Sequence, residues 1–267
     1  MSMKQFAVIG DPINQSLSPI LHKNIFKQMK INASYERLLI PPEKISLFVN
    51  DCDLDGYNIT IPNKQVIIPL LSNLCEAAEI IGAVNCVKGS KGYNTDWVGF
   101  IKAVKNNKVD LFNKRCLILG AGGVARAVAY GLIKEKVQAI DVKNRTDKHA
   151  DELLKWINSI YPNQKNKDDT PDIIINCTPL GMWPNIESTP DTMHHPGQVL
   201  IDTVYNPIET KWMSLGKASG AKAISGLEMF IYQGLASADI WFDYNISGKV
   251  DKKLIIKELN KKLCYQN

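Results

Sequence analysis

A glycine-rich turn constrains the fold of this 267-residue chain more than any other feature of its sequence. Residues 120–125 read Gly-Ala-Gly-Gly-Val-Ala, directly after the apolar run 116–119 and directly before a stretch with helical periodicity. Gly120 permits a tight turn, Gly122 lets the backbone approach phosphate oxygens, and Ala125 is small enough for a helix to pack closely on a strand. Because the turn stands between a strand and a helix, it predicts a Rossmann-type dinucleotide-binding domain.

Short apolar runs alternate with amphipathic stretches along most of the chain. Strands are predicted at residues 6–9, 35–40, 57–61, 83–88, 116–119, 139–142, 172–176, 199–202 and 221–224. Helices are predicted at residues 19–29, 74–81, 96–105, 124–134, 147–160, 208–218 and 227–241, with a polar loop at 163–170. This alternation is typical of parallel sheets that carry helices on both faces.

The order of these elements predicts an α/β protein with two domains. The first is an N-terminal, open and mostly parallel α/β domain for the substrate, formed by residues 1–101 together with 236–267. The second is a Rossmann-type cofactor domain at residues 102–235. The C-terminal helices would close the first domain, so the cofactor domain would be an insertion within it.

Composition excludes several classes of protein. An apolar fraction of 45% is too high for a disordered chain, and no apolar run approaches the roughly 18 residues of a membrane span. The net charge of +5 is mild and its lysines are dispersed, which argues against a nucleic-acid partner. The six cysteines lack C-x-x-C spacing and the four histidines are scattered, so we expect reduced thiols, no metal and a cytoplasmic location.

Four polar clusters in the first domain are candidates for a substrate site. They are residues 16–19, 58–64, 82–85 and 92–96. Each lies at the end of a predicted strand or in the loop beyond it, where open α/β sheets bind ligands. Together they gather hydroxyls and amides with one amine, from Lys64, and one carboxylate, from Asp96.

The strand after the glycine turn is followed by residues that would read the adenosine ribose of a dinucleotide. Arg145 could pair with a 2′-phosphate, which favours NADP. Asp147 could accept hydrogen bonds from an unphosphorylated ribose, which leaves NAD possible. Asp141 has a suitable spacing from the glycines but falls inside the predicted strand, so we discount it.

In their order along the chain, these motifs resemble those of the shikimate dehydrogenase family. The resemblance spans nearly the whole sequence and is carried by residues 10–13, 16–22, 58–64, 82–85, 92–96, 120–125, 144–146, 176–182, 226–229 and Gln233. It implies an NADP-dependent oxidoreductase that reversibly reduces 3-dehydroshikimate to shikimate. That reaction belongs to the shikimate pathway, which leads to chorismate and the aromatic amino acids.

The resemblance also implies roles for individual residues. The substrate would be held by Ser16, Ser18, Thr60, Lys64, Asn85, Asp96, Tyr205 and Gln233. The cofactor would be held by Gly120, Ala121, Gly122, Gly123, Val124, Asn144, Arg145, Thr146, Thr203 and Gly226. Lys64 and Asp96 would be catalytic, with Lys64 transferring the hydroxyl proton and Asp96 positioning both the substrate and Lys64. Members of the family are commonly monomers or homodimers.

Some positions depart from the family pattern and keep alternatives open. Asn63 replaces a more usual phenylalanine, His149 stands where many NADP-using members have a second arginine, and Trp97 replaces a commoner glycine. Asn63 and Asp147 resemble the quinate/shikimate dehydrogenases, which accept NAD, whereas Thr60 is the shikimate-type residue. The alternatives are therefore a quinate/shikimate dehydrogenase that accepts NAD and, more remotely, a non-catalytic protein that senses the cofactor.

Overall fold

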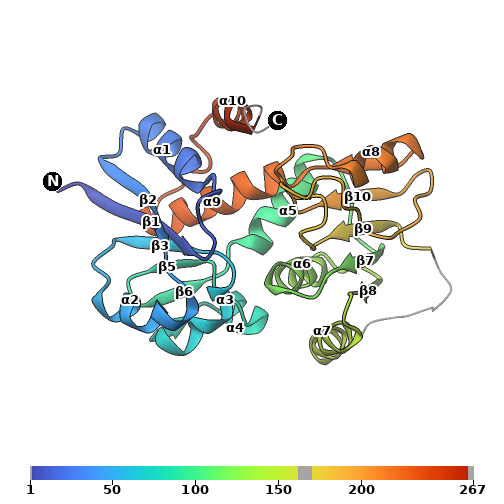
Figure 1. Cartoon of the computed structure of the whole chain (residues 1–267), viewed down its shortest axis with the longest axis horizontal. Coiled ribbons are helices and arrows are strands. Elements are labelled where there is room, and N and C mark those ends of the chain that lie inside the picture. The colour runs from blue at the N-terminus through green and yellow to red at the C-terminus, as the bar shows by residue number, and fades with distance from the viewer. Residues whose placement is uncertain (1, 162–169, 264–267) are drawn as a thin grey trace. The chain divides into compact units, whose positions relative to one another are not determined.

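The computed structural model describes residues 2–161 and 170–263, which form two compact α/β units (Figure 1). The first unit comprises Met1–Gly99 with Ile231–Asn267, and the second comprises Phe100–Phe230. Two helices, α5 (Asp96–Asn106) and α9 (Gly226–Phe242), run along the chain from one unit into the other. Most of the loop predicted at 163–170 lies outside the described residues.

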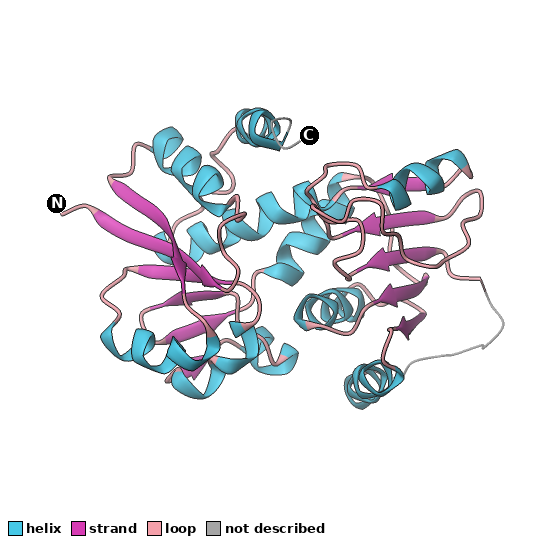
Figure 2. Ribbon diagram, in the orientation of Figure 1, coloured by secondary structure: helices cyan, strands magenta, loops and turns pink. Residues whose placement is uncertain are grey.

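The first unit contains a six-stranded sheet in the order β2-β1-β3-β5-β6-β4. Its strands are drawn in magenta in Figure 2. Its strands are β1 (Lys4–Gly10), β2 (Ala33–Leu39), β3 (Gly56–Ile59), β4 (Asn73–Leu74), β5 (Cys86–Lys88) and β6 (Lys91–Tyr93). Its helices are α1 (Ser18–Met29), α2 (Ile45–Asp51), α3 (Asn63–Val66), α4 (Glu76–Ile81) and α10 (Lys252–Leu263), with short 3-10 turns η1 (Pro42–Lys44) and η2 (Ile68–Leu70). Only β5 is antiparallel to its neighbours, so the predicted mostly parallel sheet is confirmed.

The second unit contains a five-stranded, wholly parallel sheet in the order β11-β10-β9-β7-β8. Its strands are β7 (Arg115–Leu119), β8 (Ala139–Lys143), β9 (Ile173–Asn176), β10 (Val199–Asp202) and β11 (Lys222–Ile224). Its own helices are α6 (Gly123–Lys134), α7 (Asp147–Ile160) and α8 (Lys211–Ala218). The strand order reverses between β7 and β9, which is the position where such sheets bind nucleotides.

Several predicted boundaries were wrong where local hydrogen bonds decide them. The third strand ends at Ile59 rather than at residue 61, because the Asn63 N–H bonds to the Thr60 carbonyl and turns the chain. The helix predicted from residue 208 begins at Lys211, because the Thr210 hydroxyl accepts the Met213 N–H as an N-cap. Helices α2 and α3 were not predicted, because each is only seven or four residues long.

An aromatic cluster fills the core of the first unit beside β1. Phe6 stacks on Trp241 with 4.7 Å between ring centroids, and it also contacts Phe26 and Phe242. His22 lies in the same cluster, fully buried and stacked on Tyr35 at 4.3 Å. Because Trp241 and Phe242 belong to α9, this core joins the start of the chain to its C-terminal segment.

The buried imidazole should make the first unit sensitive to acid. Burial lowers the pKa of His22 from 6.5 to about 3. Between these two pH values the ring stays neutral in the folded state, whereas in the unfolded chain it binds a proton. The stability that depends on the neutral ring is therefore present above pH 6.5 and is lost as the pH falls towards 3. We expect protonation of His22 in the unfolded chain to lower the free energy of unfolding by about 2 kcal/mol as the pH falls from 7 to 5.

Urea titrations of the wild type and of His22→Phe at several pH values measure this loss. The variant should lack that part of the pH dependence, and His195→Gln, a change at an exposed histidine, should retain it. Equal pH slopes for the wild type and His22→Phe would contradict the prediction.

Candidate active site

The direction of β5 gathers polar side chains at one edge of the first sheet. Thr60 follows β3 and Asp96 follows β6, so both lie beyond the carboxyl ends of parallel strands. Asn85 precedes β5, and because β5 runs in the opposite sense, its beginning lies at the same edge. The backbone fixes this arrangement, since Asn85 O accepts the Ile59 N–H at 2.9 Å and Asn85 N donates to Tyr93 O at 3.0 Å.

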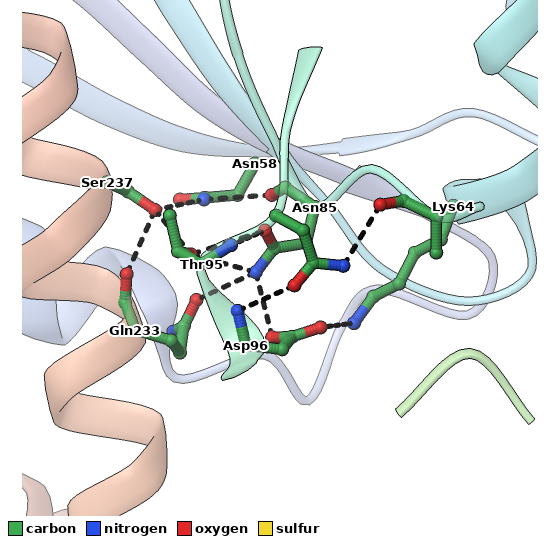
Figure 3. Close-up of polar contacts among 9 residues, drawn as sticks. Asn58, Lys64, Asn85, Thr95, Asp96, Gln233 and Ser237 are labelled. Atoms are coloured by element: carbon green, nitrogen blue, oxygen red, sulfur yellow. Dashed lines mark hydrogen bonds and ion pairs between the residues drawn. The ribbon is translucent and has the colours of Figure 1, made fainter. Parts of the chain in front are cut away.

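Lys64 and Asp96 form an ion pair at this edge (Figure 3). The Lys64 Nζ lies 2.6 Å from the Asp96 Oδ2, and the two side chains are only 13% and 9% exposed. Lys64 projects from α3, whose position is set in part by a hydrogen bond from Val84 N to Lys64 O. Asp96 begins α5, where its N–H donates to Asn94 Oδ1. The pair therefore comes from two elements far apart in sequence.

The side-chain amide of Asn85 holds the other oxygen of that carboxylate. Asn85 Nδ2 donates to Asp96 Oδ1 at 2.8 Å, and Thr95 N donates to Asn85 Oδ1 at 2.6 Å. Gln233, on α9, brings its Oε1 to 3.4 Å from the same Asn85 nitrogen. The structure thus brings together Lys64, Asn85, Asp96 and Gln233, all of which the sequence singled out (Figure 3).

Three further buried residues belong to this network. Asn58 and Thr95 lie within the predicted polar clusters 58–64 and 92–96 but were assigned no role, and Ser237 was not predicted. Asn58 of β3 donates to Asn85 O at 3.1 Å and to Ser237 Oγ at 2.9 Å. Ser237 and Thr95 lie with their hydroxyl oxygens 3.2 Å apart. A signal existed in the sequence, because Ser237 stands four residues after Gln233 and therefore on the same face of the helix.

Ser16 and Thr60 lie in the loops that follow β1 and β3, and Ser18 ends the first of these loops. Ser16 Oγ is 3.2 Å from Ser18 Oγ, and Ser18 is the first residue of α1. The Ser16 carbonyl accepts a hydrogen bond from Arg37 Nε at 2.8 Å, which anchors the loop to β2. Thr60 N bonds to Ile9 O of β1. None of these three side chains has a direct bond with the Lys64–Asp96 pair among the contacts described.

The unusual Asn63 has a structural role. It is completely buried, and its Nδ2 donates to Ile40 O at 2.6 Å. This bond attaches the start of α3 to the chain that leaves β2. Asn63 therefore fixes the short helix that carries Lys64.

In the second unit, the glycine turn lies at the point where the strand order reverses. Gly120 has a φ of +102°, and an added Cβ would lie only 3.1 Å from the Cys177 backbone, so the tight turn requires glycine. At Gly122 an added Cβ would meet no protein atom within 4 Å. Gly122 is also the N-cap of α6, and no side chain caps this helix. The space and the helix N-terminus suit a dinucleotide pyrophosphate.

The remaining predicted cofactor residues follow the neighbouring strands. Asn144, Arg145 and Thr146 connect β8 to α7, and the Arg145 side chain is exposed. Thr203 follows β10, and both its N–H and its hydroxyl donate to Asn176 O. Gly226 touches this loop so closely that a Cβ would lie 2.5 Å from Thr203 O. Close packing within the protein thus accounts for a glycine at position 226.

Tyr205 is the one predicted substrate residue that belongs to the second unit. Its ring stacks on Phe230 with 4.5 Å between centroids. The same loop is shaped by buried Asp202, which accepts hydrogen bonds from Val204 N, Asn176 Nδ2 and Thr210 Oγ1. Desolvation raises the pKa of Asp202 to about 6.

Residues 2–161 and 170–263 contain no cluster of three His, Cys, Asp or Glu side chains arranged to hold a metal ion. In the same part of the chain, no helix is long and apolar enough to cross a membrane. The five cysteines in it, Cys52, Cys75, Cys86, Cys116 and Cys177, are free thiols, and Cys264 lies outside it.

The fold and these side chains define the class of protein. A parallel sheet with a glycine turn at its reversal point binds a dinucleotide, and a lysine paired with a carboxylate among polar side chains can exchange a proton with an alcohol. Together they are the components of a dehydrogenase that uses a nicotinamide cofactor.

Comparison with known proteins identifies the family. A model described as the shikimate dehydrogenase substrate binding domain matches residues 8–87, and one for shikimate / quinate 5-dehydrogenase matches residues 102–179. The shikimate dehydrogenase (NADP(+)) of Staphylococcus aureus strain MSSA476 is 39% identical over 264 residues, covering 96% of this chain and 98% of that protein. The chain belongs to the shikimate dehydrogenase family.

Solved structures agree with this assignment. A crystal structure of a shikimate dehydrogenase in complex with NADP+ matches with a TM-score of 0.88 and 35% identity, covering 96% of each chain. A shikimate 5-dehydrogenase from Listeria monocytogenes in complex with shikimate and NAD matches with a TM-score of 0.82 and 27% identity, covering 95% of this chain and 96% of that one.

The open space at Gly122 yields a prediction about cofactor binding. Gly122→Ala should leave the folded protein intact, because its Cβ meets no protein atom and the backbone there has an ordinary negative φ of −83°. The methyl group would occupy the space that a pyrophosphate needs, so the KM for NADP should rise at least about tenfold. Thermal unfolding should be unchanged and the KM for shikimate little affected. An unchanged KM for NADP would place the pyrophosphate elsewhere.

Proposed function

We propose that this protein is an NADP-dependent shikimate dehydrogenase of the shikimate pathway. It would reduce 3-dehydroshikimate to shikimate with NADPH and a proton, and catalyse the reverse oxidation of the 3-hydroxyl. Membership of the family supports the reaction. The observation that carries it in this chain is the buried pairing of Lys64 with Asp96, held by Asn85, at the ligand-binding edge of the first sheet.

Lys64 would transfer the proton. In the reductive direction its ammonium donates a proton to the oxygen of the ketone as that oxygen becomes a hydroxyl, and in the oxidative direction its amine accepts the proton back. Asp96 would hold the Lys64 Nζ in place and accept a hydrogen bond from a substrate hydroxyl. Because the pair is almost removed from water, its charges act strongly on a bound substrate.

The other polar residues of the first unit would orient the substrate. Ser16 and Ser18 have hydroxyls that can donate to its carboxylate, and Thr60, Asn85 and Gln233 can bond to its ring hydroxyls. We also assign Tyr205 to the substrate, as the resemblance to the family implies.

The second unit would bind NADP through the turn at 120–124 and the residues after β8 and β10. When bound, the nicotinamide supplies or accepts the hydride. The backbone N–H groups at the start of α6 would hold the pyrophosphate, while Asn144, Arg145 and Thr146 would contact the adenosine end and Thr203 and Gly226 the rest of the cofactor. The exposed Arg145 suits a 2′-phosphate, since its guanidinium can bond in a bidentate manner.

One observation favours a second candidate, a quinate/shikimate dehydrogenase that accepts NAD. Asp147 begins α7 and is exposed two residues beyond Arg145, so its carboxylate could bond to a ribose that lacks the phosphate.

Steady-state rates with shikimate and quinate, each tested with NADP and NAD, distinguish the two candidates. We expect shikimate with NADP to give the highest kcat/KM, because Arg145 favours the phosphorylated cofactor and Thr60 is the shikimate-type residue. A kcat/KM for quinate equal to that for shikimate would favour the second candidate. Absence of turnover with every pair would refute both and favour a cofactor-sensing protein.

The role of Lys64 can be tested by substitution. Lys64→Ala should lower kcat by at least about 100-fold, which is the usual contribution of a positioned acid or base, and should weaken shikimate binding only modestly. Lys88→Ala is a matched control, because Lys88 is also an ion-paired lysine of the first unit but pairs with Asp243 at its periphery. The control should retain kcat, and an unchanged kcat in Lys64→Ala would refute the catalytic role.

We also propose that the protein acts in the cytoplasm as a monomer or a homodimer. Supporting this location are its biosynthetic family and the free thiols of its described cysteines. Sedimentation of the purified protein at several concentrations would establish the oligomeric state.

A further inference from the structure

We propose that Ser237 is a positioning residue for the reaction, because its hydroxyl fixes the orientation of the Asn85 amide and, through it, the Asp96 carboxylate. The inference rests on the proposed function and adds to it a residue of α9 that does not contact the Lys64–Asp96 pair directly (Figure 3). Ser237 is completely buried in an otherwise apolar stretch of the helix, so its hydroxyl must be bonded inside the protein.

The orientation of the Asn85 amide determines what Asp96 meets. With its oxygen accepting the Thr95 N–H at 2.6 Å, the amide turns its NH2 group towards Asp96 Oδ1 and Thr95 Oγ1, at 2.8 and 2.9 Å. If the amide rotated by half a turn, its oxygen would face the carboxylate and repel it. The catalytic pair therefore depends on this one orientation.

With the Asn85 amide in this orientation, the Ser237 hydroxyl supplies an acceptor for neighbouring hydrogen-bond donors. Thr95 Oγ1 accepts a hydrogen from Asn85 Nδ2, and two acceptors lie 3.2 Å away for its own hydrogen, Ser237 Oγ and Asn85 Oδ1. Ser237 also accepts from Asn58 Nδ2 at 2.9 Å and donates its hydrogen to Gln233 O at 3.0 Å. Every donor in the chain from Asn58 through Ser237 and Thr95 to Asn85 is then satisfied.

Removing the Ser237 hydroxyl would reverse part of this chain. Thr95 would lose one of its two acceptors, which leaves Asn85 Oδ1, 3.2 Å away, for its hydrogen. A Thr95 hydroxyl whose hydrogen is not committed to Ser237 can either accept from the Asn85 NH2 group or donate to the Asn85 oxygen. It would therefore no longer favour the amide orientation that presents the NH2 group to Asp96. Lys64 and the substrate hydroxyl would then be positioned less precisely by Asp96, although neither contacts Ser237.

The experiment is a double-mutant cycle with Ser237→Ala and Thr95→Val. We expect Ser237→Ala to lower kcat/KM for shikimate about tenfold, with the KM for NADP unchanged. Thr95→Val should lower it at least as far. The double variant should be no worse than Thr95→Val alone, because both changes break the same chain of bonds. Independent structural damage would instead give losses that multiply.

Trp241→Phe is the matched control. It removes another buried hydrogen bond of the same helix, from Trp241 Nε1 to Val87 O at 3.0 Å, and neither Trp241 nor Val87 donates to or accepts from Asn58, Ser237, Thr95 or Asn85 in the bonds described above. It should lower the melting temperature but leave kcat/KM for shikimate unchanged. If Ser237→Ala does not fold, Ser237→Cys offers a side chain of similar shape with a weak acceptor, and the same loss is expected.

The outcomes separate the two proposals. A wild-type enzyme inactive on shikimate would overturn the proposed function. An active wild type together with an unaffected kcat/KM in Ser237→Ala, or with losses that multiply in the double variant, would overturn only the role of Ser237.

Discussion

The site of the first unit depends on the direction of one short strand. In a wholly parallel sheet, the residue before a strand lies at the edge opposite the residues that follow the other strands. Because β5 is antiparallel, Asn85 instead lies beside the ends of β3 and β6, where its amide reaches Asp96. The direction of this three-residue strand thus decides whether the Asn85 amide can reach the Asp96 carboxylate. The Lys64–Asp96 pair depends on that contact.

Such an ion pair is costly to bury unless its remaining hydrogen-bonding capacity is used. Here one carboxylate oxygen accepts from Lys64 and the other from Asn85. The polar chain continues through Thr95, Ser237 and Asn58 to the Tyr35 hydroxyl, which donates to Asn58 Oδ1 at 2.7 Å. A fully satisfied network of this kind is rigid, and this rigidity suits a site that must present one oxygen and one amine in fixed positions.

Much of the fold could be predicted because its signals are local. The glycine turn, the buried strand before it and the helix after it follow from periodicity and from residue size, and they appear as predicted. The first sheet was harder, because β4 and β6 have only two or three residues, and no local pattern reveals that β5 runs antiparallel. Ser237 escaped prediction because its partners are distant in sequence, whereas Lys64 and Asp96 stood out by their chemical type.

The discontinuous first unit affects how the chain folds during synthesis. Domains generally fold in the order in which they leave the ribosome. The second unit, Phe100–Phe230, is complete before the last part of the first unit has been made. Until Trp241 and Phe242 emerge, Phe6 lacks two of its aromatic neighbours and Asn58 lacks the Ser237 hydroxyl. A nascent chain that stalls within α9, after Phe230, would therefore expose the apolar face of β1 although its cofactor unit is complete, and would need protection from aggregation at that surface.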